Sequence, residues 1–529
     1  MASLAPFATR YAVNGMVCAV DHLAAEAGVS MLRAGGSAAD AAVATSAVLA
    51  VTTQHMCGMG GDLQAVVCAP GRDPVALVGS GRAGSGADAD ALRAEGHRHM
   101  PVRGDIRTVT VPACVDGWVE LHAAYGRLAL SEVLEPARAY AADGFPASQT
   151  LAPSSALVAR LPGAQDYPAH LAPGGIVRRP GVARTLAAIG SGGRRAFYEG
   201  EFGAGLVAMA GGYITPADLE VVQAVWSLPV TAEAWGLALW TTPPPTQGYL
   251  APAAAWIASG LDLPSDSADP AWAHLLIEAA RQAGADRVDV LHEAADGTAL
   301  VDPARLGPRR TAVSPKRAAE LPGGWGEGGT IGLCAVDSDR LGVAMLQSNA
   351  TGWGAHLVEA STGIFLHNRG LGFSLQPGHP AEYGPGRRPP HTLSPLALTT
   401  ADGGLRGVMA SMGGDSQPLI LLQLLARRQV CAEGPGDAVA AGRWSLAGLD
   451  PVPGAEGFST WNQRGRVGVV LEGHCPPGWA EALAGLGHRV STTAPFDHGF
   501  GHAHVIAVED DHLAGASDPR PLAGAAAGY

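Results

Sequence analysis

The chain has 529 residues, of which 47% are hydrophobic and 16% charged, so it can build a large core, and this composition argues against a disordered protein. The formal net charge is −13 and no basic stripe is present, which argues against nucleic-acid binding. Seven scattered cysteines without a CxxC pair argue against a disulfide framework or a zinc ribbon, and buried free thiols are expected.

No targeting or membrane segment is predicted. Residues 1–15 contain no apolar run of the length found in signal peptides. The most apolar long stretch, 38–51, is too short to span a bilayer and contains Asp40. We therefore expect a cytoplasmic protein without a membrane partner.

The N-terminal third is predicted to contain helices around a glycine-rich turn. Residues 22–34 have helical composition and stop at a Gly-Gly pair, and Ser37 then predicts the N-cap of a helix over 38–50. The turn over 54–62 leads into a strand at 63–68. Two or three further helices are expected within 115–142 and 270–283.

The middle of the chain carries the clearest β signal. Residues 304–329 are rich in Pro, Gly and Arg and predict an exposed loop. Two apolar runs follow, 330–336 and 341–346, and the turn residues between them predict a β-hairpin that begins at Thr330.

The remaining elements complete a layered pattern. A second glycine-rich turn, 411–416, precedes a predicted helix at 419–427. Strands at 467–471 and 504–508 then alternate with a helix at 479–486. Buried strands that alternate with helices predict an α/β or α+β fold with layered packing.

The sequence Gly328-Gly329-Thr330 can support self-cleavage. Two glycines allow backbone conformations that other residues avoid, and a hydroxyl residue follows directly at the start of a strand. If the Gly329–Thr330 bond is strained, the Thr330 hydroxyl can attack the preceding carbonyl, and hydrolysis then frees Thr330 as a new N-terminus. Its α-amine, with an intrinsic pKa of about 7.7–8.0, can serve as the base for its own hydroxyl.

Seven blocks of sequence resemble the γ-glutamyltranspeptidase family in order and spacing. They include GMVCAVDHLAAEAG near the N-terminus, QHMCGMGGD, the GGTIGLCAVDSDRLGVAMLQSN hairpin and MASMGGDSQP. The matching segments are 15–51, 54–62, 108–148, 328–349, 365–395, 409–418 and 501–529.

The resemblance implies an α+β fold, the four-layer αββα sandwich of N-terminal-nucleophile hydrolases. It implies one precursor cut into a large chain, 1–329, and a small chain, 330–529, held together as a heterodimer, with higher oligomers possible. It implies a small-molecule substrate, and neither a metal nor an organic cofactor. Two H-x-H pairs, at 97–99 and 502–504, lack an evident third ligand for a metal.

The resemblance also assigns roles to individual residues. Thr330 is the expected nucleophile. Gly413 and Gly414 match the glycine pair whose backbone N–H groups form the oxyanion hole, which suits residues without side chains. Asn349 matches the residue that holds the substrate's amino-acid end, and Arg82 matches the arginine that pairs with the substrate's α-carboxylate.

Several positions depart from the family pattern. Gln347 stands where a hydroxyl residue supports the nucleophile, and Gly372 stands where a carboxylate grips the substrate ammonium. Arg369 replaces an amide or acid and would attract a carboxylate, or alternatively serve as a structural ion-pair partner. His391 and Thr392 replace a serine pair that touches the α-carboxylate. These changes argue against breakdown of glutathione.

Three functions remain open from the sequence. The first is hydrolysis or acyl transfer of γ-glutamyl or related carboxylate-bearing acyl amides. The second is C–C bond hydrolysis in a specialised pathway, as in alkylproline antibiotic biosynthesis, which the missing ammonium anchor and Arg369 make credible. The third is a binding protein that is never cut, against which the intact Gly-Gly-Thr and Gly-Gly motifs argue.

Overall fold

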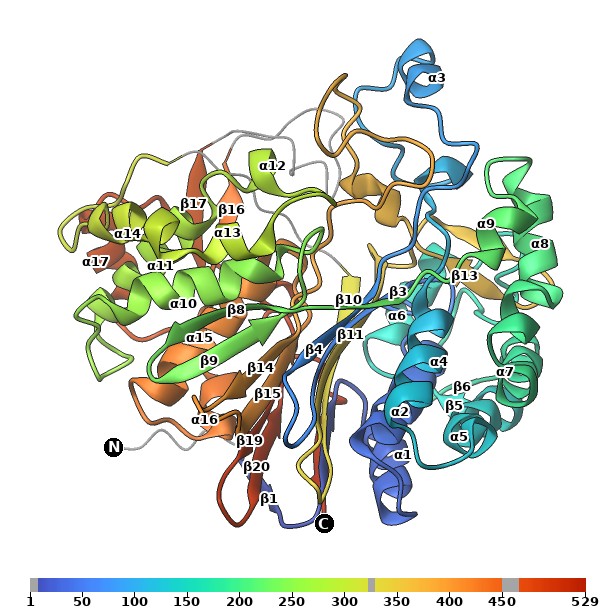
Figure 1. Ribbon diagram of the computed structural model, residues 1–529, viewed down its shortest axis with the longest axis horizontal. Helices are drawn as coiled ribbons and strands as arrows, with labels where there is room; N and C mark the ends of the chain where they lie inside the picture. Colours follow the sequence, from blue (N-terminus) through green and yellow to red (C-terminus); the bar gives the residue numbers. More distant parts are fainter. Residues whose placement is uncertain (1–7, 322–328, 450–465) are drawn as a thin grey trace.

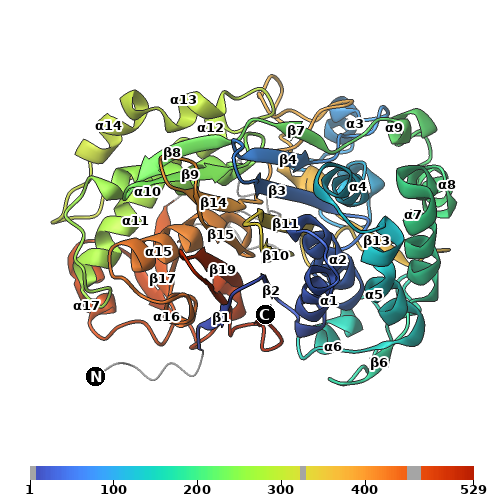
Figure 2. The same ribbon diagram turned by 60° about the horizontal axis from the view of Figure 1, so that its bottom comes forward.

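Two seven-stranded sheets packed face to face form the centre of the molecule (Figures 1 and 2). The computed structural model describes residues 8–321, 329–449 and 466–529. In spatial order the first sheet consists of β1 (Arg10–Ala12), β20 (Leu513–Ser517), β19 (Ala503–Val508), β15 (Leu405–Ser411), β14 (Leu396–Thr399), β9 (Leu237–Thr241) and β8 (Val230–Ala234). The second consists of β21 (Ala525–Gly528), β2 (Met16–Ala19), β10 (Gly329–Val336), β11 (Gly342–Ala350), β3 (Asp62–Cys68), β4 (Val75–Gly79) and β7 (Val225–Ser227). Neighbouring strands in both sheets are antiparallel.

Helices cover the outer face of each sheet, so that four layers result (Figure 2). The second sheet is covered by α1 (His22–Arg33), α2 (Ala38–Thr52) and α4 (Cys114–Tyr125), with α5 (Leu130–Asp143), α7 (Pro180–Tyr198) and α8 (Glu201–Ala210) outside them. The first sheet is covered by α10 (Leu250–Ser259), α15 (Gln417–Gln429) and α16 (Pro435–Ala440), with α11 (Pro270–Gly284), α14 (Pro303–Thr311) and α17 (Trp479–Gly485) beside them. This αββα sandwich confirms the predicted fold.

Shorter elements connect the layers. The short helices are α3 (Ala89–Ala94), α6 (Leu151–Ser154), α9 (Pro216–Glu220), α12 (Arg287–Val290) and α13 (Gly297–Val301). The 3-10 turns are η1 (Ile106–Thr108), η2 (Ser155–Leu157), η3 (Gln247–Tyr249), η4 (Arg369–Gly372), η5 (Gly414–Ser416) and η7 (His498–Phe500). Small sheets pair β5 (Phe145–Pro146) with β6 (Ile176–Val177), β12 (Leu357–Glu359) with β13 (Ile364–Leu366), and β16 (Trp444–Gly448) with β17 (Val467–Leu471) and β18 (Val490–Thr492).

Helix α2 shows how local signals and burial combine. Ser37 caps it as predicted: its hydroxyl accepts from the amide of Asp40, and the Asp40 carboxylate accepts from the amide of Ser37. Every residue of α2 is buried, because α1, α4, α5 and the β10–β11 hairpin enclose it. Its Ala, Ser and Thr side chains are small enough for this close packing.

The loop predicted over 304–329 is wrong at its start, where the structure has helix α14, Pro303–Thr311. Asp302 caps this helix by accepting from the amide of Ala304, and proline suits its first position. Leu306 is the only buried residue of this helix, so its sequence lacks the regular spacing of apolar residues by which a helix is usually predicted. Arginines fix the helix instead: Arg305 and Arg309 both pair with Asp286. Residues 322–328, with Gly328, lie outside the described residues.

The remaining predicted elements in the described residues are confirmed. Helices α1, α4, α5, α11, α15 and α17, strands β3, β17 and β19, and the β10–β11 hairpin lie at the expected positions. Within the ranges that the structure describes, no helix has the length and apolar character needed to cross a bilayer.

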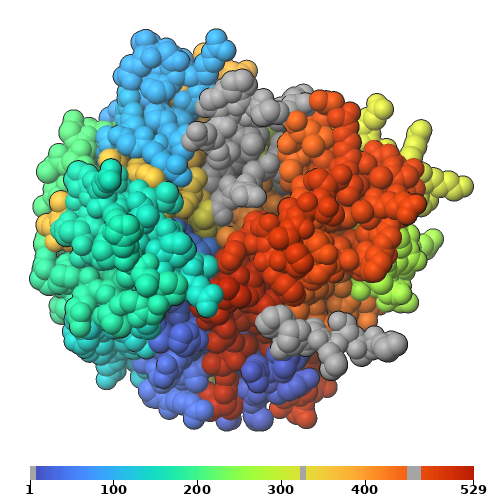
Figure 3. Space-filling model, turned by 180° about the vertical axis from the view of Figure 1, so that it is seen from behind, coloured from blue at the N-terminus to red at the C-terminus, as the bar shows by residue number. Residues whose placement is uncertain are grey.

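Each large sheet contains strands from both sides of the predicted cut. In the second sheet, β10 and β11 lie between β2 and β3, which come from the N-terminal part. In the first sheet, β14 of the C-terminal part pairs with β9 of the N-terminal part. Seen from behind, the N-terminal and C-terminal segments meet along the middle of the molecule (Figure 3). Cleavage before Thr330 would therefore leave two chains held by shared sheets.

A buried cluster of charges joins the last strands to the small β16–β18 sheet. Asp518, just after β20, accepts from Arg443 Nη2 at 2.5 Å and from Arg520 Nη1 at 3.0 Å. Arg520 also pairs with Glu472, and all four side chains are almost fully buried. Burial by itself raises the pKa of Asp518, but the two arginines outweigh it and hold the pKa well below its ordinary value.

Replacement of Asp518 by Asn should destabilise the fold by about 3–5 kcal/mol, because it leaves buried arginines without their partner charge. The folded-state pKa is lowered, so this stabilisation is present above the unfolded pKa of about 3.9 and shrinks as the pH falls below it. Urea unfolding of both proteins between pH 3 and pH 8 measures this difference. The control is Asp510→Asn at the exposed Arg406–Asp510 pair, which should leave the free energy of unfolding unchanged within error.

Candidate active site

Thr330 lies on the second residue of β10, in the middle of the second sheet, and its side chain is fully buried. The β10–β11 ladder is regular from the turn up to Ile331, which pairs with Gln347. The register shifts between Ile331 and Gly329, which pairs with Ala350. Such an irregularity re-aims the chain locally, and bulges of this kind are common beside active sites. The predicted scissile bond thus lies at the one irregular point of this ladder.

Ser348 contacts both sides of the predicted scissile bond. Its Oγ lies 3.0 Å from Thr330 Oγ1 and donates to the carbonyl oxygen of Gly329 at 2.8 Å. Its Oγ also accepts from the amide of Ala350 at 2.8 Å and from Arg369 Nη2 at 2.9 Å. The Ser348 hydroxyl therefore lies within hydrogen-bonding distance of both the Gly329 carbonyl oxygen and the Thr330 hydroxyl.

The sequence comparison had placed Gln347, without a hydroxyl, at this supporting position, and the structure corrects it. Gln347 lies opposite Ile331, so its side chain points to the helical layer, where Oε1 accepts from Ser46 and Nε2 contacts Cys114. Counting on from that pair puts Ser348 opposite Thr330, and opposed residues of an antiparallel pair share a face. The hydroxyl is therefore present, one residue further along the strand.

Arg369 forms a buried ion pair with Asp62. Arg369 Nε donates to Asp62 Oδ2 at 2.6 Å, and its side chain is 2% exposed. Nη1 donates to the Thr392 hydroxyl at 3.3 Å. The alternative role expected for Arg369, a structural ion-pair partner, is thus present in the geometry, together with a direct contact to Ser348.

His391 supports the same carboxylate. Its Nε2 lies 2.8 Å from Asp62 Oδ2, and its Nδ1 accepts from the amide of Leu393. Burial, together with the nearby Arg369 charge, lowers the pKa of His391 to about 4, so a neutral imidazole donates to Asp62 through Nε2–H at neutral pH. Burial raises the pKa of Asp62, but Arg369 and His391 outweigh it and keep the pKa well below its ordinary value.

Gly413 and Gly414 reach the same region from the other sheet. Cys334 Sγ contacts the carbonyl of Val408, and a Cβ on Gly332 would meet the backbone of Ala410. The two strands therefore run antiparallel across the interface, so that the start of β10, with Thr330, and the end of β15, after which Gly413 follows, lie at the same end. Gly413 has φ 145° and Gly414 φ 53°, conformations that favour glycine.

Gln247 links the glycine turn to the ion-pair cluster. Its Nε2 lies within hydrogen-bonding distance of the carbonyls of Gly414 and Thr392, at 3.1 and 3.2 Å. Its Oε1 accepts from Arg287 at 2.8 Å. Gln247 lies more than a hundred residues from both Thr392 and Gly414 in the sequence. It stands in a stretch without a recognisable motif, so no sequence signal singled it out.

Two predicted site residues lie apart from the Thr330 hydroxyl. Asn349 follows Ser348 on the strand and so faces the helical layer, where Nδ2 donates to the carbonyl of Gln54. The Arg82 guanidinium donates to Glu293 Oε1 at 2.8 Å and to the carbonyl of Gly386 at 2.7 Å. The Arg82 side chain is about one third exposed, whereas Thr330 is enclosed.

The missing acidic anchor has a steric cause. Gly372 ends the turn η4, and a Cβ at this position would collide with the carbonyl oxygen of Pro390. No carboxylate side chain can therefore occupy position 372 in this backbone. The glycine is required by the close approach of two chain segments.

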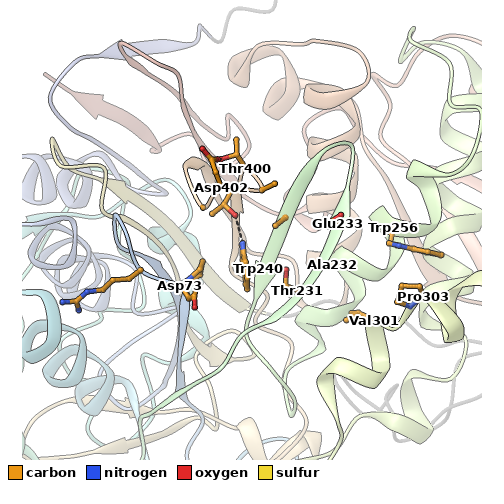
Figure 4. A pocket seen from close by; sticks show the side chains of 16 residues that line it. Asp73, Thr231, Ala232, Glu233, Trp240, Trp256, Val301, Pro303, Thr400 and Asp402 are labelled. Carbon is orange, nitrogen blue, oxygen red and sulfur yellow. Dashed lines mark hydrogen bonds between the residues drawn. The ribbon is translucent and has the colours of Figure 1, made fainter.

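A hollow of about 630 Å³ lies beside β8 and β9 at the edge of the first sheet (Figure 4). It is lined at the edge of the first sheet by Trp240, whose Nε1 donates to the Thr399 hydroxyl, and by Trp256, Asp73 and Asp402. None of the predicted site residues lines it. Among the residues that the structure describes, no three His, Cys, Asp or Glu side chains gather in a group that could hold a metal ion.

Known proteins resemble this chain over nearly its whole length. The family model described as gamma-glutamyltranspeptidase matches residues 24–529. An oxamate amidohydrolase proenzyme of Klebsiella pneumoniae is 36% identical, with 98% of each chain covered. A glutathione hydrolase-like YwrD proenzyme of Bacillus subtilis is 31% identical over 96% of this chain and 97% of its own.

Solved structures agree with this likeness. The cephalosporin acylase of Bacillus halodurans superposes with a TM-score of 0.88 at 30% identity, covering 99% of this chain and 97% of its own. The match of sequence and fold extends across both the Thr330 hairpin and the Gly413 turn. The chain is therefore an enzyme of the γ-glutamyltranspeptidase family, which belongs to the N-terminal-nucleophile hydrolases.

Proposed function

We propose that this protein cleaves itself between Gly329 and Thr330 and then acts as an amide hydrolase with Thr330 as its nucleophile. The observation that carries the proposal is the Ser348 hydroxyl, which lies 2.8 Å from the scissile carbonyl oxygen and 3.0 Å from the attacking hydroxyl. In the uncut chain, Ser348 can stabilise negative charge that develops on the Gly329 oxygen as Thr330 Oγ1 attacks. The names of the similar proenzymes agree with processing of a precursor.

After cleavage the new Thr330 amine is the group suited to take the hydroxyl proton. Its intrinsic pKa of about 7.7–8.0 lies near neutral pH, where a general base works well. Thr330 Oγ1 then attacks the substrate carbonyl, and an acyl-enzyme forms and is released by water. Gly413 and Gly414 are the proposed oxyanion donors, because in the described part of the chain neither of their amides is engaged in a hydrogen bond.

The proposed substrate is a short amide that carries a carboxylate. Gly372 cannot be replaced by an acidic anchor for a γ-glutamyl ammonium, and the buried Thr330 favours a small acyl group. Oxamate has this chemistry and is named for a relative that is 36% identical. Arg82 is not assigned to the carboxylate of so short a substrate, because it lies apart from the Thr330 hydroxyl and pairs with Glu293. We assign Asn349 no contact with the acyl group.

Wild-type protein should be cut into two fragments, whereas Thr330→Ala should stay whole because it lacks the attacking hydroxyl. Dividing 53.7 kDa in the proportion of 329 to 200 residues gives fragments of about 33 and 20 kDa. Intact-mass measurement and N-terminal sequencing check this, and the smaller fragment should begin Thr330-Ile331-Gly332. An uncut wild type would contradict the proposal and favour the binding-protein alternative.

Ser348→Ala should slow self-cleavage by about 10²- to 10³-fold, the usual effect of losing one donor to a developing oxyanion. Gln347→Met is the matched control, since the neighbouring side chain faces the helical layer and keeps a similar volume. A time course of the fragment masses measures both rates. Equal rates for the two variants would show that Ser348 does not act on the scissile carbonyl.

The mature enzyme should release ammonia from oxamate and leave a γ-glutamyl anilide intact, because the site lacks an acidic anchor for the γ-glutamyl ammonium. Ammonia detection and the absorbance of the freed anilide measure the two activities. Release of the anilide alone would restore the γ-glutamyl assignment. A processed protein that cleaves neither amide would favour the C–C bond hydrolase alternative.

A further inference from the structure

The hydrogen bonds around Ser348 leave its hydroxyl only one role. A serine hydroxyl has one proton to donate and two lone pairs with which to accept. The amide of Ala350, at 2.8 Å, and Arg369 Nη2, at 2.9 Å, are both donors that cannot accept in return. They fill the two lone pairs, so the Ser348 proton must point to the Gly329 carbonyl or to Thr330 Oγ1.

The direction of the Arg369 guanidinium is set by Asp62. Nε and Nη2 both face the carboxylate, at 2.6 Å from Oδ2 and 3.4 Å from Oδ1. The second proton of Nη2 is then directed at Ser348, since the planar guanidinium holds its donors in a fixed fork. His391 fixes Asp62 in turn by donating to Oδ2 at 2.8 Å.

We propose that the buried Asp62–Arg369 pair is a positioning device that keeps Ser348 a hydrogen-bond donor, first to the scissile carbonyl and, after cleavage, to the nucleophile. Arg369 contacts the Ser348 hydroxyl, which in turn contacts the Gly329 carbonyl oxygen and Thr330 Oγ1, so the pair acts through Ser348. This positioning role differs from that of a substrate-binding cation, which the sequence suggested for Arg369. This inference rests on the proposed self-cleavage at Thr330.

The chemistry balances with water as the only co-reactant. Thr330 Oγ1 forms a bond to the Gly329 carbonyl carbon, the Gly329–Thr330 C–N bond breaks, and the hydroxyl proton ends on the Thr330 nitrogen. Water then hydrolyses the ester, leaving a Gly329 carboxylate and a free hydroxyl on Thr330. Ser348 donates to the Gly329 oxygen while that oxygen carries negative charge. Once the Gly329 carboxylate has left, the Ser348 proton can turn to Thr330 Oγ1.

The two members of the pair should be removed together. Loss of Arg369 alone would leave the Asp62 carboxylate buried without a partner charge, which destabilises proteins strongly. The double substitution Asp62→Asn with Arg369→Met avoids this unpaired charge. We expect it to slow self-cleavage by about 10- to 100-fold, the effect of losing one hydrogen bond to a charged group.

A double-mutant cycle with Ser348→Ala tests whether the pair acts through Ser348. In the Ser348→Ala background, the Asp62→Asn/Arg369→Met change should slow cleavage no further, because the hydroxyl that it orients is absent. The proposal would be overturned if the rate reductions of the two changes multiplied. It would also be overturned if the Asp62→Asn/Arg369→Met protein cleaved itself at the wild-type rate. In material that has matured, the pair substitution should lower kcat and leave KM unchanged, whereas a rise in KM alone would show substrate binding instead.

A matched control separates this role from general stability. Asp116 and Arg194 form another buried pair, with 2.8 Å between Arg194 Nε and Asp116 Oδ1, that joins α4 to α7. Asp116→Asn with Arg194→Met should keep the cleavage rate even if the melting temperature falls. If the Asp62→Asn/Arg369→Met protein does not fold, Arg369→Lys replaces it in the cycle, because one ammonium retains the charge but cannot serve Asp62 and Ser348 in fixed directions.

The cycle also distinguishes two failures. A wild-type chain that is not cut before Thr330 contradicts the proposed function itself. A wild-type chain that is cut normally, with a pair variant that is cut equally fast, contradicts only the positioning role of Asp62 and Arg369.

Discussion

The Asp62 carboxylate is the buried charge around which the site is arranged. An ionised carboxylate in a protein interior is costly unless other groups pair with it and satisfy it. Arg369 and His391 supply that compensation, and their own orientations are fixed in return. Because Arg369 also reaches Ser348 and Thr392, one ion pair ties the start of β3, the turn η4 and the Thr330 hairpin into a single unit.

The sandwich explains how such a unit could tolerate the proposed cut in its centre. Strands β10 and β11 are bonded on both sides to strands of the N-terminal part, and their inner face packs on β15. From Ile331 onward, the paired residues of the ladder lie beyond the Gly329–Thr330 peptide. A new chain end at Thr330 can therefore form inside the core, where neighbouring strands on either side keep its position.

Side chains on the two faces of β11 have different surroundings. Gln347 and Asn349 point to the helices, where Ser46, Cys114 and Gln54 engage them. Ser348, between them, points to the other sheet and to Thr330. A shift of one residue in the strand would exchange these faces, so the hairpin register decides which polar side chain meets Thr330. Family resemblance alone misplaced that residue by one position.

The sequence by itself determined the elements that depend on neighbouring residues and the motifs that repeat a known pattern. The Ser37 cap, the β10–β11 hairpin and the Gly-Gly-Thr motif are local signals, and the seven ordered blocks identified the family and its fold. Helix α14 was not predicted, because it is held in place by arginines that pair with Asp286 and not by an apolar stripe. Only the tertiary structure decided that Arg369 meets Asp62, 307 residues away, and that Gly372 leaves no room for an anchor. These contacts depend on how distant segments pack against one another, and such packing leaves no periodic trace in the chain.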